Sequence, residues 1–551
     1  AIRAIECASS KRFVSLISEH LIKENYCPLL VSAKGQEQQI AGAKQLIFFD
    51  SPANILLEEF SAARESENYT GSFSSYYRET NTVNAFFKHI STLLVNHNQL
   101  LVSPDNLFKS LLLLEDTFEL SFDKVPYGKV FNENSTRELD DHTQQEIERL
   151  YAKEYEVYQA LARHFSHRWD EFRQRTKANY ARFSNAVIHV GPPKTGTSAI
   201  QSWLNQNRKA LGDKEIDYPA HGSDSNGISA GNFAQLISYT KSKTPYFDKQ
   251  RLDTLLNKMG RKPTSTVLLS SEHFYYFLPW LFTYLPSAQY IFFIRHPIPL
   301  FESGYHQQIK RHRRTNEYRA PNQMFFNNLN VISHLSREFG VTVTYKFYDQ
   351  IVPGSQGIYE AIASCFKTFI DPPAVDTKIN SKFTPGALTL MREANKFASK
   401  NMRFELDRWL QCYSEGKPDF SLTSKDALNK ISLHLMEQVE KLTASDPSLE
   451  RQQLLALIKN YQTSSVAELA SSIDNVQSVL QTLKRDYPAL AYTLIAGAVQ
   501  KKKSDILGQH SVVESLYGSS GKLKLPLAYF LAEKWVTLQA LRRKILKKMK
   551  D

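Results

Sequence analysis

The amino-acid sequence predicts an α/β protein with a parallel β-sheet flanked by helices. Three features support this prediction. Between residues 184 and 385, short apolar runs rich in β-branched residues alternate with helical segments. A turn of glycine, proline, threonine and serine follows the first of these runs and leads into an amphipathic segment. From residue 386 onward the pattern is helical almost throughout, which predicts a helical C-terminal extension.

Four runs are expected to form the strands of this sheet. Helical segments separate them, as the crossovers between parallel strands require. The runs are VIHV from residue 187, TVLLSSE from 266, YIFFIRHP from 290 and VTVTYKFYD from 341. In the extension, helices are predicted for ALTLMREANKF, DALNKISLHLMEQVEKL and NVQSVLQTLKRDYPALAYTLI. These patterns divide the chain into 1–183, 184–385 and 386–551.

The first of these regions has the pattern of a diverged internal repeat of the second. Three pairs of segments are similar, the first pair clearly and the third only loosely. The alternative is chance similarity, because α/β units of unrelated proteins share such patterns. The pairs are 47–60 with 292–305, 84–107 with 322–351, and 132–135 with 380–383.

The first copy lacks the charges that the second copy offers to an anion. Asp50 stands at the position of Arg295, and Glu58 stands at that of Ser303. A carboxylate in place of an arginine repels a phosphate group, and the candidate loop of the first copy, 6–21, has no glycine. We therefore expect residues 1–183 to have a structural role or to form a homodimer.

The composition, 42% hydrophobic and 23% charged, is typical of a soluble globular protein. No window approaches the roughly 18 to 20 apolar residues of a membrane span, and charged residues interrupt every apolar run near the start. The four cysteines lack C-x-x-C spacing, which favours reduced thiols in the cytoplasm and no metal site. The net charge of +12 favours an anionic ligand. A nucleic-acid partner is not expected, because no recognised module accompanies the charge.

The stretch 187-VIHVGPPKTGTSAIQSWL-204 is similar to a phosphate-binding loop with its lysine displaced. The standard loop is G-x-x-x-x-G-K-[ST]. Gly191 and Gly196 have the required separation, but Thr197 occupies the lysine position and the lysine lies inside the loop as Lys194. Two prolines, the second being Pro193, stiffen the start of the loop. This pattern does not match the loop that holds the β- and γ-phosphates of ATP.

The residue types of this loop nevertheless suit an anion. Gly196, Thr197 and Ser198 would place backbone N–H groups and the positive end of a helix dipole on phosphate oxygens. Lys194 would add a mobile positive charge, and Thr195, Thr197 and Ser198 would add hydroxyl donors. The alternative is an ordinary strand-to-helix turn without a ligand.

A second anion site is predicted from 295-RHPIPLFES-303. Arg295 follows an apolar strand, and the carboxyl ends of strands are where open α/β sheets bind ligands. Ser303 comes two turns along a helix expected to start near Pro297. Together, the arginine and the hydroxyl would hold a phosphate by charge-assisted hydrogen bonds. A structural salt bridge of Arg295 is the alternative.

The two elements together resemble the PAPS-dependent sulfotransferase family, in particular bacterial members that modify carbohydrates. The matching motifs are P-K-T-G-T-S after one strand and R-x-P-x-x-x-x-x-S after another, with 270-SSEHF-274 after the intervening strand. The resemblance covers roughly 185 to 385 well and the rest more loosely. It implies the sulfotransferase fold, PAPS (3′-phosphoadenosine 5′-phosphosulfate) as donor, adenosine 3′,5′-bisphosphate as product, and no metal. The donor-binding residues that it implies are Pro193, Lys194, Thr195, Gly196, Thr197, Ser198, Arg295, Ser303, Asn380 and Ser381.

Sulfuryl transfer is similar to phosphoryl transfer, so it needs positioning and charge stabilisation more than covalent chemistry by the protein. Lys194 is expected to neutralise charge on the bridging oxygen. A general base should take the proton of the acceptor hydroxyl. Glu272 is the preferred candidate, ahead of His273 and then His221. For each, an ordinary capping or core hydrogen bond is the alternative.

The expected acceptor is a hydroxyl or amine of a carbohydrate, such as a cell-surface polysaccharide or glycolipid. The run 306-HQQIKRHRRTNEYR-319 would attract an acidic acceptor through Lys310, Arg311 and Arg314, with His221 as a further contact. A solvated helix face is the ordinary explanation of such a run, and neutral sugars stay open as acceptors. The basic amphipathic tail 535–551 suits peripheral contact with the inner membrane, or packing on the core.

Two other functions stay open at this point. One is a P-loop kinase that uses ATP, against which Thr197 at the lysine position argues. The other is a non-catalytic nucleotide-binding scaffold.

Overall fold

The computed structural model describes most of the chain from residue 140 onward. The described residues are 140–180, 185–222, 229–259 without 242, 266–351, 357–366, 383–413, 415, 420–461, 473–501, 504, 506, 507, 513, 516 and 527–548, with short pieces between 29 and 118. Asn380 and Ser381 lie outside them, and so does the 6–21 loop.

The centre of the molecule is a five-stranded parallel sheet with the order β10-β9-β4-β8-β5. The four strands predicted from the sequence are confirmed. The fifth, β5, was not predicted because it has only two residues. The strands are β4 (Ala186–Val190), β5 (Ile216–Asp217), β8 (Thr266–Ser271), β9 (Gln289–Ile294) and β10 (Val343–Phe347).

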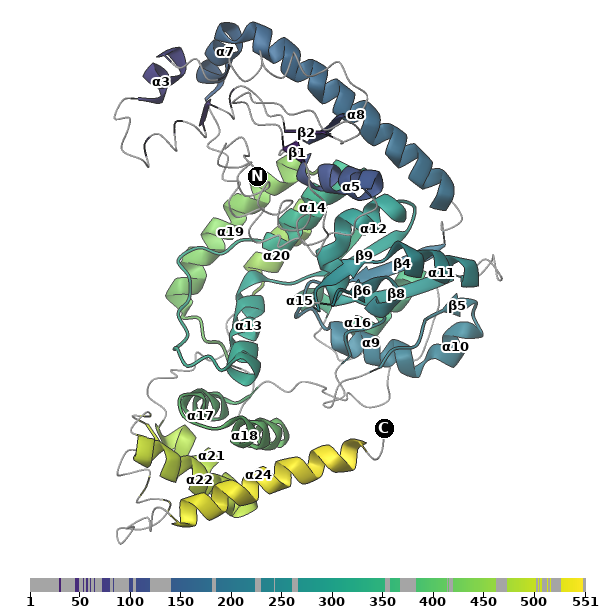
Figure 1. Cartoon of the computed structure of the whole chain (residues 1–551). Helices are drawn as coiled ribbons and strands as arrows, with labels where there is room; N and C mark the ends of the chain where they lie inside the picture. The colour runs from purple at the N-terminus through teal and green to yellow at the C-terminus, as the bar shows by residue number, and fades with distance from the viewer. Residues whose placement is uncertain are drawn as a thin grey trace.

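Helices cover both faces of this sheet (Figure 1). Alternate side chains of a strand point to opposite faces. In β4, Val187 therefore shares a core with residues of α9 (Thr197–Gln206), α10 (Arg208–Gly212) and α16 (Gly357–Ala363). Ile188 and Val190 belong to the core of the other face, with α12 (Leu278–Tyr284) and α14 (Asn327–Phe339). The prediction of a parallel sheet flanked by helices is thus confirmed.

Smaller elements complete the sheet region. Two short strands form an antiparallel pair that the sequence did not predict. The elements are η3 (Phe233–Gln235), β6 (Ile237–Tyr239), β7 (Pro245–Phe247), α11 (Lys249–Met259), η4 (Glu272–Phe277), α15 (Tyr348–Ile351) and η5 (Ser364–Phe366).

The N-terminal region contains a three-stranded parallel sheet, β1-β2-β3, and packs on the main domain. The long helix α8 contributes Trp169, whose ring centre lies 5.6 Å from that of Phe339 in α14. Glu115 of α5 accepts a hydrogen bond of 2.8 Å from the indole of Trp280. β2 pairs with β3 in parallel, as β9 pairs with β10, and the internal repeat stays a prediction. The elements are β1 (Leu29–Leu30), β2 (Gln45–Phe48), α3 (Phe73–Glu79), β3 (Gln99–Val102), α5 (Leu107–Phe118), α7 (Asp141–Leu150) and α8 (Ala152–Tyr180).

The described part of the C-terminal region is helical, and it is divided between two cores. Helices α19 (Lys425–Ser445) and α20 (Arg451–Lys459) join the core of the α12–α14 face. A second core contains residues of the remaining helices, which lie below the sheet in Figure 1. One predicted helical run is broken at Pro488, because proline cannot continue a helix from the preceding turn. The remaining helices are α17 (Pro385–Asn395), α18 (Lys400–Cys412), α21 (Ile473–Asp486), α22 (Pro488–Lys501) and α24 (Leu527–Lys548).

Helix α13 (Pro297–His312) connects the two cores. It starts at Pro297, as the sequence predicted, and its first turn buries Ile298 in the core of the α12–α14 face. Further along, Tyr305 and Ile309 belong to the second core. Glu302, between these two parts, is buried and holds the segment that precedes α19. Its Oε1 accepts hydrogen bonds from Ser421 Oγ (2.8 Å), Leu422 N (2.8 Å), Thr423 N (2.9 Å) and Thr423 Oγ1 (2.9 Å).

The last helix, α24, packs on α18 and α22 through Val536, which is fully buried. One of its basic residues, Arg543, forms an ion pair with the buried Glu405 of α18. Trp535, Leu538 and Leu541 are exposed. Peripheral membrane contact through this tail stays a prediction. None of the helices in the described residues has both the length and the apolar character that a bilayer crossing requires.

Candidate nucleotide-binding and transfer site

The candidate residues lie at one edge of the main sheet. Because the strands are parallel, β4, β8, β9 and β10 all end at this edge. The chain runs from β4 to β5 and β8 on one side and then crosses to β9 on the other side. Such a change of direction opens a crevice at the carboxyl ends of the strands, where open α/β sheets bind ligands. The loop after β4 starts at this point.

Two glycines allow the chain to follow the path of this loop. A Cβ atom on Gly191 would lie 2.0 Å from Cγ2 of Thr197. Gly196 has a φ of +77°, and a Cβ atom there would lie 2.4 Å from Cδ1 of Ile358. Lys194 also has a left-handed backbone, with a φ of 76°. This conformation is uncommon for a residue other than glycine and is found at functional sites.

The loop leads directly into α9, whose first turn has no side-chain cap. Ala199 N and Ile200 N donate to the carbonyl oxygen of Gly196. The N–H groups of Thr197 and Ser198 come before this first bond, at the positive end of the helix dipole. The start of α9 therefore has the backbone chemistry of an anion site.

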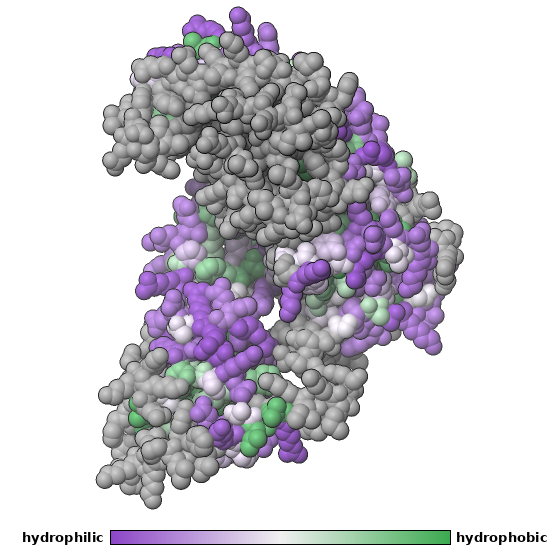
Figure 2. Space-filling view, in the orientation of Figure 1, coloured by the Kyte–Doolittle hydropathy of each residue, from purple (hydrophilic) through white to green (hydrophobic). Residues whose placement is uncertain are grey.

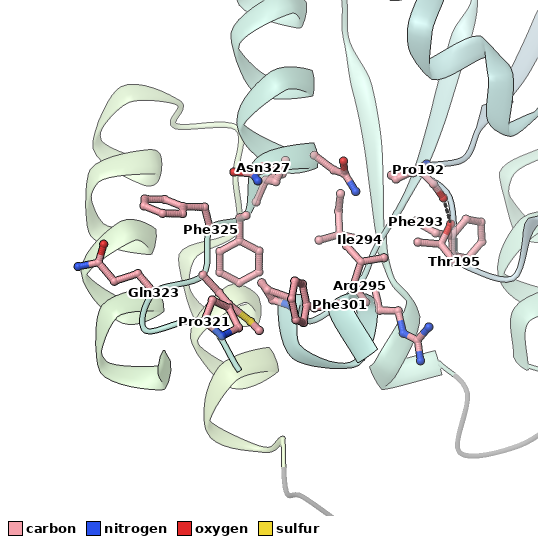
Figure 3. Close-up of a pocket in the computed structure, with 16 residues that line it drawn as sticks. Pro192, Thr195, Phe293, Ile294, Arg295, Phe301, Pro321, Gln323, Phe325 and Asn327 are labelled. Atoms are coloured by element: carbon pink, nitrogen blue, oxygen red, sulfur yellow. Dashed lines mark hydrogen bonds between the residues drawn. The ribbon is translucent and has the colours of Figure 1, made fainter. Parts of the chain in front are cut away.

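Two hydroxyl groups of the loop have partners within the protein. The buried Thr195 donates to the carbonyl oxygen of Pro192 at 2.8 Å and so fastens the loop, as the dashed line in Figure 3 shows. Thr197 donates to Oε2 of Glu272 at 3.3 Å. Both were expected to donate to a ligand. Ser198, which is partly exposed, has no such contact recorded within the described residues and offers its hydroxyl at the start of α9.

Arg295 brings the two predicted anion-binding segments together. It follows β9, and its Nη1 donates to the carbonyl oxygen of Lys194 at 2.9 Å. Its Nε lies 3.4 Å from Oδ1 of Asp349, and its guanidinium carbon lies 5.0 Å from the ring centre of Tyr348. The loop after β4 and the start of α13 are therefore in contact at the edge of the sheet.

Asp349, which the sequence analysis did not single out, fixes the residue after Arg295 as well. Its Oδ2 accepts a hydrogen bond of 2.6 Å from His296 N. Burial raises the pKa of Asp349, and the charge of Arg295 opposes this rise. The signal in the sequence was a carboxylate two residues after the end of β10, the fourth predicted strand, at the same edge as Arg295.

His296 is a second residue that the sequence analysis did not identify. Its Nδ1 accepts a hydrogen bond of 3.2 Å from Ile298 N, which caps α13. Its ring stacks on that of Tyr461 with the centres 4.3 Å apart. Burial, helped by Arg295, lowers the pKa of His296 to about 3, so the ring is neutral at pH 7. Tyr461 shows that the C-terminal region contributes to the surroundings of this site.

Lys194 lies among other charged groups. Burial lowers the pKa of Lys194, Glu272 raises it, and the positive charges of Arg295 and Arg311 lower it further. Each of these three cations also has a carboxylate near it: the charge of Glu272 acts on Lys194, Asp349 lies 3.4 Å from Arg295, and Asp407 lies 3.0 Å from Arg311. Basic side chains gathered at one place attract an anionic ligand.

Lys310 extends this group of cations. Burial lowers the pKa of Lys310 to about 8, with Asp407 opposing and Arg311 and Lys194 adding to the decrease. Its Nζ lies 3.8 Å from the ring centre of Phe383. The sequence analysis gave a solvated helix face as the ordinary explanation of this basic run, but Lys310 is partly buried.

The other predicted residues take different positions. Ser303 lies on α13 seven residues before Lys310, which places both on one face of the helix. The side chain of Arg314 bonds to Gln308 Oε1, and its guanidinium carbon lies 4.9 Å from the ring centre of Tyr305, so this side chain packs on α13 itself. Pro193 is partly exposed at the start of the loop.

The two histidine candidates lie at the carboxyl end of β8 and in the loop bound to it. His273 follows Glu272, and its ring centre is 5.1 Å from that of Phe233. His221 bonds to Tyr218 OH at 3.0 Å and to Ser229 Oγ at 2.6 Å. Burial lowers the pKa of His221. Both ring nitrogens of His221 are engaged, whereas the charge of Glu272 acts on Lys194.

A pocket of about 350 Å³ adjoins the loop on the side of α14. Pro192 and Thr195 form one wall, and Phe301 and Phe325 lie opposite (Figure 3). The guanidinium of Arg295 points away from these two rings. Hydrophobic side chains also gather in the hollow above α13 in Figure 2. The pocket is therefore largely apolar, and Arg295, which also lines it, joins it to the group of cations.

Comparison of the chain with protein-family models, with curated proteins and with solved structures found no match. The evidence for function is therefore in the residues and their arrangement.

Proposed function

We propose that the protein is a sulfotransferase that moves the sulfuryl group of PAPS to a hydroxyl or amine of a carbohydrate. The main support is the hydrogen bond of 2.9 Å from Arg295 Nη1 to the carbonyl oxygen of Lys194. It joins the two segments whose motifs resemble the donor-binding elements of sulfotransferases. Two basic residues that are 101 residues apart in sequence, Lys194 and Arg295, thus lie together at one edge of the sheet.

The residues of this edge suit a nucleotide with phosphate groups at both ends. The uncapped start of α9 and the Lys194 ammonium would hold the 5′-phosphosulfate. Arg295 and Ser303 would hold the 3′-phosphate, as charge-assisted donors do. The basic side chains around Lys194 suit such a ligand, because Lys310 adds a fourth positive charge to a group in which Glu272, Asp349 and Asp407 oppose the other three.

The donor supplies an activated sulfuryl group, whose sulfur forms a bond to the acceptor oxygen while its bond to the bridging phosphate oxygen breaks. Lys194 would stabilise the negative charge that develops on that oxygen. Glu272 would take the proton of the acceptor hydroxyl, because its carboxylate lies at the end of β8 beside Thr197. The hydrogen bond from Thr197 Oγ1 would keep this carboxylate oriented.

A thermal unfolding experiment tests the choice of nucleotide. A ligand that binds only the folded state raises the melting temperature by mass action. Adenosine 3′,5′-bisphosphate should raise it, whereas ATP with Mg²⁺ should not. The opposite result would favour a P-loop kinase.

The role of Lys194 is tested with Lys194→Ala. Loss of a donor to the developing charge should reduce turnover with labelled PAPS by about 10² to 10³, with the melting temperature unchanged within a few degrees. Unreduced sulfation by this variant would remove the role assigned to Lys194. Binding of the bisphosphate without turnover on any acceptor, in the unsubstituted protein, would instead favour a non-catalytic scaffold.

A further inference from the structure

The apolar pocket beside the loop after β4 is not needed to hold the phosphate groups of the donor. Its volume of about 350 Å³ lies within the range of about 300 to 1,000 Å³ that is usual for small-molecule sites. Among the described residues that line it, Arg295 alone carries a charge, and its guanidinium points away from Phe301 and Phe325 in Figure 3. The pocket therefore suits an uncharged, apolar group.

Two phenylalanines that line this pocket are also exposed to solvent. Phe301 of α13 is 40% exposed, and Phe325, just before α14, is 48% exposed. Covering such a ring with a ligand stabilises the complex in proportion to the apolar area removed from water. A second aromatic ring gains more than an aliphatic group of equal area, because aromatic pairs attract each other edge to face or in offset stacks. The two rings therefore favour an aromatic ligand.

The wall of the pocket that contains Phe325 is held in place by α19. The side-chain amide of Gln438 bonds to the backbone on both sides of this residue: its Oε1 accepts from Phe326 N at 3.3 Å, and its Nε2 donates to the carbonyl oxygen of Met324 at 2.7 Å. The ring of Phe325 also meets that of His434 edge to face, with the centres 5.1 Å apart. A wall that is already ordered lowers the entropy cost of binding a ligand.

The opposite wall of the pocket belongs to the loop that carries Lys194. Pro192 and Thr195, on either side of this lysine in the sequence, both line the pocket, and the hydrogen bond of 2.8 Å between them fastens the loop. The first two residues of α14, Asn327 and Asn328, line the pocket as well. Their amide groups both donate and accept hydrogen bonds, as the hydroxyl groups of a sugar require. A ligand with an apolar group in the pocket would thus have its polar part beside the loop.

We propose that this pocket binds an aromatic aglycone of the acceptor, so that the acceptor is a neutral aryl glycoside. This inference rests on the proposed function, because the loop would bring a hydroxyl of the attached sugar to the sulfuryl group beside Lys194. It assigns the choice of acceptor to the apolar surface of Phe301 and Phe325 and not to the basic run on α13. An acidic polysaccharide would leave this apolar surface uncovered.

The test uses the full chain without donor, and three probes: phenyl β-glucoside, methyl β-glucoside and phenyl β-glucuronide. Phe301→Ala and Phe325→Ala each remove one ring of the pocket. Trp535→Ala is the matched control, because Trp535 is likewise an exposed aromatic residue, at 46%, but lies on α24 and does not line the pocket. Calorimetry gives the Kd of each probe and, in a separate titration, the Kd of adenosine 3′,5′-bisphosphate. The comparison of the three probes needs only the unsubstituted protein, so it holds even if a variant fails to fold.

In the unsubstituted protein, phenyl glucoside should have a Kd at least roughly tenfold lower than that of methyl glucoside, because its ring is buried. Each pocket variant should raise the Kd of phenyl glucoside by about two- to tenfold, as loss of an aromatic pair does, and the control should leave it unchanged. Equal affinity for the phenyl and methyl glucosides, tighter binding of the glucuronide, or an equal loss in the control would overturn the proposal.

The Kd of adenosine 3′,5′-bisphosphate separates this proposal from the proposed function. It should be unchanged in both pocket variants, and a matching loss there would overturn the proposal by placing the nucleobase in the pocket. Failure of the unsubstituted protein to bind the bisphosphate would count against the sulfotransferase function alone, because the glycosides are titrated without it.

Discussion

Replacing Arg295 by lysine separates two roles of this residue: binding the 3′-phosphate of the nucleotide and holding the carbonyl oxygen of Lys194. Two of the five guanidinium N–H donors have partners in the structure, the carbonyl oxygen of Lys194 at 2.9 Å and Asp349 at 3.4 Å, so three are left for a ligand. Lysine keeps the charge but cannot form a bidentate pair with a phosphate. A hydrogen bond to a charged group contributes about 1.5 to 3 kcal/mol. Because the side chain is 21% exposed, we expect the lower part of this range, about 2 kcal/mol, which is roughly a 30-fold increase in Kd.

The assay compares two nucleotides by calorimetry. If Arg295 holds the 3′-phosphate, Arg295→Lys should raise the Kd of adenosine 3′,5′-bisphosphate by this factor. The Kd of adenosine 5′-monophosphate should be nearly unchanged. If Arg295 acts only by holding the Lys194 carbonyl, both nucleotides should lose affinity equally, and that result would refute the assignment. Arg319→Lys, at an exposed arginine, is the control for general charge effects.

Three further predictions concern the base, the cations and the loop. Glu272→Gln should lower kcat and kcat/KM together by about 10² to 10⁴ in steady-state assays, as loss of a general base does. His273→Gln should have a much smaller effect, and equal effects of the two substitutions would contradict the choice of Glu272 as the base. Since the pKa of Lys310 is about 8, affinity for the bisphosphate should fall as pH rises through about 8, and Lys310→Arg should flatten this profile in calorimetric titrations. Folding lowers this pKa from its usual 10.5, so the unfolded chain binds more protons between these values and the stability contribution of Lys310 rises with pH there. Gly196→Ala should reduce the free energy of unfolding by at least about 2 kcal/mol, from the left-handed backbone and the overlap with Ile358; a loss below about 1 kcal/mol in equilibrium urea denaturation would show that the loop adapts.

β4, β8 and β9 were predictable because each contains a continuous apolar run, the pattern of parallel strands that are covered on both faces. β10 (VTYKF) is less buried, and its β-branched and aromatic residues predicted it. The start of α13 at Pro297 was equally visible, since proline is favoured in the first turn of a helix. β5 was not, because Ile216–Asp217 is too short to produce a pattern.

The candidate site was predictable only in its local parts. The motifs identified Lys194 and Arg295, but nothing local could show that the guanidinium of one bonds to the carbonyl oxygen of the other. Asp349 carries no motif, and its role depends on the pairing of β10 with β9. Lys310 belongs to a basic run that looks exposed in the sequence, and its contact with Phe383 depends on the tertiary packing of α13.

Helix α13 contributes residues to both hydrophobic cores, and this has a mechanical consequence. Its start follows Arg295, which bonds to the loop after β4, Asn395 bonds to the carbonyl oxygen of Ile309 near its end, and Glu302 bonds its middle to the segment before α19. A helix held at three places transmits displacement as a rigid rod. A shift of the helices of the second core would therefore be passed through α13 to Arg295 and its hydrogen bond with the carbonyl oxygen of Lys194.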